Sequence, residues 1–149
     1  DVTHGGAWHI GVLTAPGIPE MLLAGRERAF LADYAIPSLS ASSDAFTNTD
    51  IDELVRCYAR PGAFLGAAGL YRSLLAEGEE FRELAARKLD LPVLAVAGRS
   101  RDFTPSTLRQ VAVDVTVTHI DGIGHYVAME APGQLATALR TFYADIDRT

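Results

Sequence analysis

The sequence predicts an α/β chain in which a helical region, residues 1–88, precedes two parallel strands with their helices, residues 89–149. The run from Pro92 to Ala97 is continuously apolar, which is typical of a strand covered on both faces in a parallel sheet. Residues Val113 to Thr118 alternate apolar and polar side chains, the period of a strand with one buried face. After Pro132, apolar residues recur at helical spacing and predict an amphipathic C-terminal helix.

Prolines, glycines and capping residues mark the helices of the first region. The predicted helices begin near Pro19, Gly25, Thr49, Ala63 and Glu79. We expect Pro37 and the serines after it to end the second of them, because proline does not continue a helix. We expect Gly78 to end the fourth, as glycine does at many helix C-termini.

Between the two strands, Gly98 to Asp102 forms the exit loop of the first strand, where α/β folds place ligand-facing groups. Pro105 to Gln110 is predicted to be a short helix that returns the chain to the second strand. A sheet of two strands is not stable by itself. We therefore expect a partner to supply further strands, such as a second copy in a homo-oligomer.

Composition excludes several classes of function. The 149 residues carry a net charge of −6, which disfavours nucleic acid as a partner. The single cysteine, Cys57, cannot form an internal disulfide, and no spacing suggests a metal site, so neither a metal nor another cofactor is expected. The lone cysteine fits a cytoplasmic location, which is expected here, and a reduced secreted chain is the alternative. No apolar run is long enough to span a membrane, and no signal-peptide pattern is present.

The main candidate for chemistry is His125, which follows the turn Asp121-Gly122-Ile123-Gly124 beyond the second strand. A lone histidine is as often a structural imidazole bonded to backbone as a reactive group. Here a strand precedes it, glycines flank its approach and a helix follows. This context favours a base at the carboxyl end of the sheet.

The stretch Gly122-Ile123-Gly124-His125-Tyr126-Val127-Ala128-Met129-Glu130-Ala131-Pro132 resembles the G-H-x-x-x-x-E-x-P motif of α/β-hydrolases. Trp8-His9, the run from Gly17 to Phe30, and the segment from Tyr58 to Tyr71-Arg72 resemble the cap of epoxide-hydrolase-like members. The resemblance is to the group that contains epoxide hydrolases and haloalkane dehalogenases. It implies the C-terminal portion of a capped α/β-hydrolase, with residues 1–88 as helical cap and 89–149 as the last part of the core.

The resemblance also implies a mechanism. In this family a carboxylate nucleophile forms a covalent ester, and the histidine activates the water that hydrolyses it. His125 would be that base. No G-x-[S/D]-x-G turn is present, so the nucleophile is expected outside this chain. Asp102 is the candidate acid partner of His125. In the alternative, the acid comes from an earlier strand outside this chain, and Asp102 is a solvated loop carboxylate.

The cap residues have competing interpretations. Tyr71 resembles a cap tyrosine that protonates the opening epoxide oxygen, but it also lies on the apolar stripe of its helix. Trp8 and His9 are candidates for a substrate pocket wall, whereas an aromatic anchor for a short helix is equally compatible with Trp8. Fluoroacetate-type dehalogenases use a His-Trp pair where this chain has His9-Ile10, and isoleucine donates no hydrogen bond to halide. A small apolar substrate, an epoxide, ester or haloalkane-like compound, is expected.

A second class of function also fits. The sequence starts without methionine, and no apolar strand precedes His4-Gly5, so we expect a chain that begins partway into the fold. Such a chain is either the cap and C-terminal core of a hydrolase or a truncated, inactive fragment that serves as an interaction module or remnant.

Overall fold

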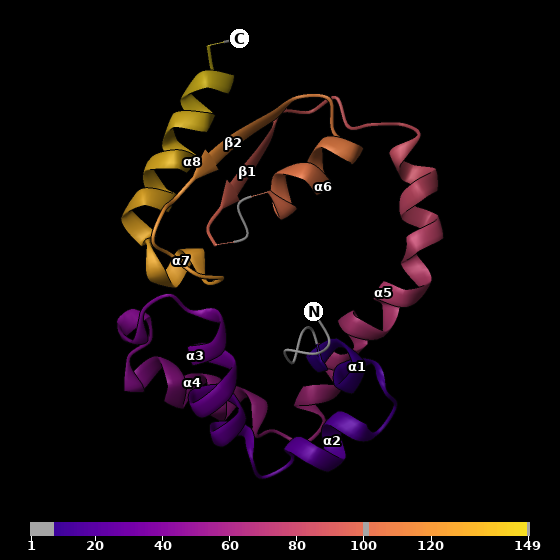
Figure 1. Ribbon diagram of the computed structural model, residues 1–149, viewed down its shortest axis with the longest axis vertical. Coiled ribbons are helices and arrows are strands. Elements are labelled where there is room, and N and C mark those ends of the chain that lie inside the picture. Colours follow the sequence, from indigo (N-terminus) through magenta and orange to yellow (C-terminus); the bar gives the residue numbers. More distant parts are fainter. Residues whose placement is uncertain (1–7, 100–101, 149) are drawn as a thin grey trace. The chain divides into compact units, whose positions relative to one another are not determined.

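The computed structural model describes residues 8–99 and 102–148 (Figure 1). The described residues form two compact units. One contains the residues up to Ala35 together with Asn48–Phe81, and the other contains Ile36–Thr47 together with the residues from Arg82 onward. The division into a cap at 1–88 and a core at 89–149 stays a prediction.

The first unit is helical. It contains α1 (Trp8–Thr14), α2 (Ile18–Leu23), the π-helix η2 (Ala29–Ala35), α4 (Asn48–Tyr58) and most of α5 (Ala63–Ala85). Gly17, Gly25 and Gly62 have positive φ angles of 77°, 74° and 76°, which glycine adopts without steric cost, and they stand between these helices. The proline, glycine and capping signals in the sequence therefore predicted the helix starts near 19, 49 and 63 correctly.

Phe64 is the centre of packing in the first unit. Its side chain is buried, and its ring lies 5.0 Å from that of Tyr58 and 6.2 Å from that of Phe30, measured between centroids. Ala68, one turn further along α5, is also fully buried. The aromatic residues of η2, α4 and α5 thus share one apolar cluster.

One predicted helix end is wrong, and another falls a few residues after the proline. Gly78 does not stop α5, which is continuous from Ala63 to Ala85; strong helix formers on both sides outweigh the roughly 1 kcal/mol cost of one interior glycine. The helical stretch passes Pro37, the second residue of α3 (Ile36–Leu39), and ends directly before Ser40, so the serines mark its end and the proline does not. In the first turn of a helix the N–H that proline lacks is not needed.

The second unit is built around a two-stranded parallel sheet. It contains α3, the 3-10 helix η3 (Ser43–Ala45), β1 (Val93–Ala97), α6 (Phe103–Val111), β2 (Val115–His119), α7 (Val127–Glu130) and α8 (Pro132–Ile146). Val93 pairs with Val115, and the register continues to Ala97 and His119. The predicted parallel neighbours are confirmed.

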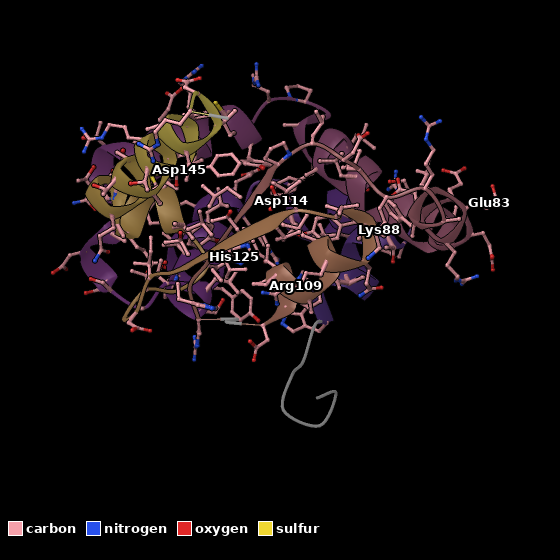
Figure 2. All side chains as sticks on the ribbon, turned by 90° about the horizontal axis from the view of Figure 1, so that it is seen from above. Glu83, Lys88, Arg109, Asp114, His125 and Asp145 are labelled. Atoms are coloured by element: carbon pink, nitrogen blue, oxygen red, sulfur yellow. The ribbon has the colours of Figure 1, made fainter. Side chains whose placement is uncertain are left out.

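Helices α6 and α8 lie on opposite sides of this sheet (Figure 1). Ala95 and Ala97, on one face of β1, are almost completely buried. At the base of the sheet, Lys88 donates from Nζ to the backbone oxygen of Arg109 at 2.7 Å, so the chain entering β1 is tied to the end of α6 (Figure 2). Across the described stretches, no helix combines the length and apolarity needed to cross a membrane.

Candidate active site

His125 lies on the loop that joins β2 to α7 (Figure 2). Ile120 and Ile123 are buried and form a small core with Ala131, which fixes both ends of the loop. Gly122 has a φ of 77° and supplies the left-handed turn between them. The loop therefore begins at the carboxyl end of the sheet, as the sequence predicts.

At two positions around this loop, close packing leaves room only for glycine. A Cβ on Gly98, directly after β1, would lie 2.6 Å from the backbone oxygen of Gly124. A Cβ on Gly124 would meet the backbone oxygen of Leu39 at 2.2 Å. Gly124 does not have a positive φ, so it is needed for space and not for an unusual backbone angle. The His125 loop thus lies against the exit of β1 on one side and the end of α3 on the other.

The backbone around His125 is held by one carboxylate. Glu130 Oε2 accepts the backbone N–H of Gly124 at 2.9 Å and that of Ala41 at 2.7 Å, and Oε1 accepts that of Tyr126 at 3.0 Å. The N–H of His125 itself donates to the oxygen of Leu39 at 2.8 Å.

These hydrogen bonds set the acidity of Glu130. Partial burial raises the pKa of this carboxyl group. Hydrogen bonds from the backbone of Ala41, Gly124, Tyr126 and Ser42 lower the pKa by more than burial raises it, so the net pKa is below the ordinary value. The ionised form therefore persists at neutral pH, and it can accept all of these N–H groups because a carboxylate has no proton of its own to clash with them.

The side chain of His125 is exposed. Its ring lies 5.4 Å from that of Tyr126, nearly perpendicular at 82°, and the Tyr126 ring in turn packs edge-on against Phe46 at 5.0 Å. Within residues 8–99 and 102–148, the imidazole of His125 makes no hydrogen bond to another group. A solvent-exposed ring whose nitrogens bond no group in the described stretches is available to act on a bound molecule.

Asp102 stands directly before α6, where its carboxylate makes no capping hydrogen bond and its side chain is exposed. The backbone oxygen of Asp102 accepts the N–H of Ser106 at 2.9 Å. The structure therefore puts Asp102 and His125 in the same unit, after the carboxyl ends of β1 and β2, without joining them by a hydrogen bond. Their pairing stays a prediction.

A pocket of about 460 Å³ opens beside the His125 loop. It is lined by Ser40, Ala41, Gly98, Arg99, Ile120, Asp121, Gly122 and Ile123. The lining combines the exit of β1, the turn after β2 and the segment after α3, so the pocket lies at the carboxyl end of the sheet. His125 is not among the lining residues.

The cap candidates gather in the first unit. The rings of His9 and Tyr71 meet edge-on with centroids 6.0 Å apart, and Trp8 lies edge-on to His9 at 6.4 Å. Trp8 donates its indole N–H to the hydroxyl of Tyr34. Trp8 is thus both a residue of the short helix α1 and a member of this aromatic group. The structure brings Trp8, His9 and Tyr71 together in the first unit. His125 and Asp102 belong to the second unit.

Tyr71 also borders an opening of its own. A pocket of about 470 Å³ is lined by Cys57, Tyr58, Arg60, Ala63, Ala67, Leu70 and Tyr71. In the described part of the chain, no group of three or more His, Cys, Asp or Glu side chains could hold a metal ion.

Sequence reasoning gave no role to Glu130, Tyr126, Phe46 or Tyr34. Glu130 belongs to the motif that drew attention to His125. Its spacing from the histidine in that motif was a sequence signal that could have pointed to its role. The other three residues make contacts with residues far away in the sequence, which no local pattern predicts.

Together, the parallel strands, the helices on both of their faces and the histidine loop define the C-terminal portion of an α/β-hydrolase fold. The solved structure of the epoxide hydrolase CorEH without ligand superposes with a TM-score of 0.82 at 26% identity, covering 93% of this chain and 50% of that chain. The particular group of hydrolases that the chain resembles is the epoxide hydrolases.

Two curated sequences carry that resemblance. The soluble epoxide hydrolase of Corynebacterium sp. (strain C12) is 30% identical over 107 residues, which is 70% of this chain and 37% of the relative. Epoxide hydrolase A of Mycobacterium tuberculosis is 27% identical over 103 residues, 66% of this chain and 32% of the relative. No family model matches. The chain thus spans about a third of the length of the curated relatives that it matches.

Proposed function

We propose that this chain is the cap and C-terminal core of an epoxide-hydrolase-like enzyme whose nucleophile lies outside these 149 residues. The observation that carries the proposal is the exposed His125 on a loop held by its backbone at the carboxyl end of the sheet, in a chain similar to epoxide hydrolases. The expected substrate is a small, largely apolar epoxide; esters and haloalkane-like compounds are the other expected classes.

The proposed reaction has two steps. A carboxylate outside this chain attacks one epoxide carbon, the C–O bond of the ring breaks, and Tyr71 donates its proton to the released alkoxide, leaving an ester. His125 then takes a proton from water, whose oxygen attacks the ester carbonyl. Collapse of that intermediate restores the carboxylate and releases the diol, whose departing oxygen takes the proton from the imidazolium of His125. The second proton of the water returns to the Tyr71 oxygen, so both side chains regain their starting state. In this scheme Asp102 stabilises the protonated imidazole, while Trp8 and His9 form part of the substrate pocket.

The proposal requires that the chain alone be inactive, because a base without a nucleophile cannot form the ester. We expect no hydrolysis of styrene oxide or p-nitrophenyl acetate by the 149-residue chain. A fusion to the part of the Corynebacterium enzyme that this chain does not match should hydrolyse styrene oxide, and His125→Ala in the fusion should abolish that activity. Turnover by the isolated chain, or a folded but inactive fusion, would overturn the proposal.

A second function, an interaction module, has one observation in its favour. Leu89, Leu91 and Val113 are 50%, 66% and 73% exposed around the amino ends of the two strands. Among the described residues, β1 pairs with β2 alone, so its other edge has free backbone groups. An exposed apolar patch beside a free strand edge is a surface on which another chain can add a strand.

Homo-oligomerisation through that edge is the specific form of this second proposal. Light scattering of the isolated chain should then give a mass above that of a monomer, and Leu91→Glu should lower it. A monomer at all concentrations would exclude this module. A reducing location such as the cytoplasm fits both proposals, since Cys57 is a free thiol.

A further inference from the structure

Glu130 connects two parts of the chain that are far apart in sequence. Its Oε2 atom accepts the N–H of Ala41 at 2.7 Å, across 89 residues, and the N–H of Gly124 at 2.9 Å. Its Oε1 atom accepts the N–H of Tyr126 at 3.0 Å. One side chain therefore bonds the residues on both sides of His125 and also the segment that follows α3.

Helix capping explains only part of this arrangement. Tyr126 is the N-cap of α7, and a glutamate in the first turns of a helix often reaches back to the N–H of its N-cap. The bonds from Gly124 and Ala41 lie outside that helix. If Glu130 served only α7, neither of these bonds would be required.

The position of the loop is fixed by steric limits as well. The N–H of His125 donates to Leu39, and the backbone of Leu39 to Ala41 comes so close to Gly124 that no Cβ fits between them. Three consecutive amides, 124 to 126, are thus bonded to partners outside the loop. The backbone at His125 has little freedom to rotate while Glu130 accepts on both sides of it.

We propose that Glu130 is a positioning residue for His125, which it places by binding the amides of Gly124 and Tyr126 and tying them to Ala41. This inference rests on the proposed function only in assigning His125 as the base. A carboxylate suits the task because it only accepts hydrogen bonds, whereas an amide in its place would turn donor hydrogens toward backbone N–H groups. Displacement of a catalytic group by about 1 Å can cost about 100-fold in rate.

The test compares Glu130→Gln with Glu130→Asp in the 149-residue chain. Amide hydrogen exchange at Ala41, Gly124 and Tyr126 and the NMR titration of the His125 imidazole are the readouts. We expect Glu130→Gln to raise exchange at the three amides at least tenfold and to change the imidazole titration, with partial recovery in Glu130→Asp. Glu53→Gln is the matched control, because Glu53 is also an acid of lowered pKa, about 2, but pairs with Arg56 in the first unit.

A measurement on the unchanged protein covers the case in which the variants do not fold. The amide proton shifts of Ala41, Gly124 and Tyr126 should titrate together, with one midpoint below the ordinary glutamate value of 4.5. Unchanged exchange and an unchanged imidazole titration in Glu130→Gln, or separate midpoints for the three amides, would overturn the inference.

These readouts need no turnover. An inactive fusion with intact protection of the three amides would therefore reject the proposed function and leave the role of Glu130 in placing His125. An active fusion in which Glu130→Gln changes neither kcat nor the pH profile would reject the positioning role alone.

Discussion

The backbone oxygen of Leu39 occupies the space that a side chain at Gly124 would need: a Cβ there would lie 2.2 Å from it. The same oxygen accepts the N–H of His125 at 2.8 Å. The three nearest atoms to the missing Cβ are this oxygen, the amide nitrogen of Ala41 at 2.6 Å and the carbonyl carbon of Ser40 at 2.8 Å, and all are backbone atoms that cannot rotate away. Residue 124 therefore decides whether the histidine loop can approach the segment after α3.

From this relationship we expect Gly124→Ala to destabilise the protein by about 2 kcal/mol or more, since overpacking against rigid backbone costs about 1–3 kcal/mol. Urea unfolding measures the difference. Gly133→Ala is the matched control, because that glycine lies in α8 and a Cβ added to it would have no atom within 4 Å, so alanine there should stabilise by about 0.5–1 kcal/mol. Similar effects of the two substitutions would contradict the close approach at Gly124.

The lowered pKa of Glu130 predicts a specific dependence of stability on pH. In the folded protein this carboxyl group stays ionised to lower pH than in the unfolded chain, so its stabilising contribution is fully present above the unfolded pKa, near 4.5, and is lost as pH falls through the folded pKa. The stability difference between wild type and Glu130→Gln should be constant at pH 6–7 and shrink below about pH 4.5.

The joined segments also carry the ionisable side chains of His125, Asp121 and Asp44, so the comparison is made between variants and not on one pH curve. Glu53→Gln is the control. Glu53 has a pKa of about 2 beside Arg56, but both side chains are largely exposed to solvent, which screens the pair, so its loss should leave the urea midpoint nearly unchanged. A difference for Glu130→Gln that stays constant down to pH 3 would contradict the assignment.

In the first unit, Phe64→Ala should destabilise strongly, by about 3–5 kcal/mol, because it removes a buried ring that contacts Tyr58 and Phe30. Leu70→Ala, on the same helix, removes a side chain that is 74% exposed and should change stability by less than about 0.5 kcal/mol. Circular dichroism during urea unfolding measures both. Equal losses would mean that Phe64 is not the centre of this cluster.

Local periodicity was sufficient to predict the parallel pairing of Val93–Ala97 with Val115–His119 and the helix after Pro132, because burial on one or both faces leaves a repeating apolar pattern. It failed at Gly78, where the propensities of the flanking residues outweigh one glycine. Sequence signals are thus strong where many residues share a face and weak where one residue must decide.

The candidate site shows the same limit. The position of His125 after a strand end follows from the glycine-rich turn, which is local. The hydrogen bond from Ala41 to Glu130 joins residues 89 positions apart in the sequence. The segment Ile36–Thr47 belongs to the unit that contains the sheet, although in the sequence it falls between the two stretches of the first unit. No periodic pattern records such contacts, so the support of the histidine loop became visible only in the structure.

The last prediction separates the two steps of the proposed reaction in the active fusion. If His125 activates only the water of the second step, His125→Gln should still permit attack on the epoxide and should block hydrolysis of the ester. General bases contribute about 10²–10⁴-fold, so the ester should persist for minutes to hours. Intact-mass spectrometry after mixing with styrene oxide should then show the protein heavier by one substrate molecule.

His119→Gln is the matched control, because His119 is an exposed histidine at the end of β2 with no part in the proposed reaction. That variant should turn over normally and show no adduct. Tyr71→Phe should instead slow formation of the ester, since the proton for the opening ring comes from its hydroxyl. Slow turnover without any adduct in His125→Gln would show that His125 acts before the ester forms. An adduct in His119→Gln would show that the adduct does not depend on the loss of His125, and would contradict the assignment.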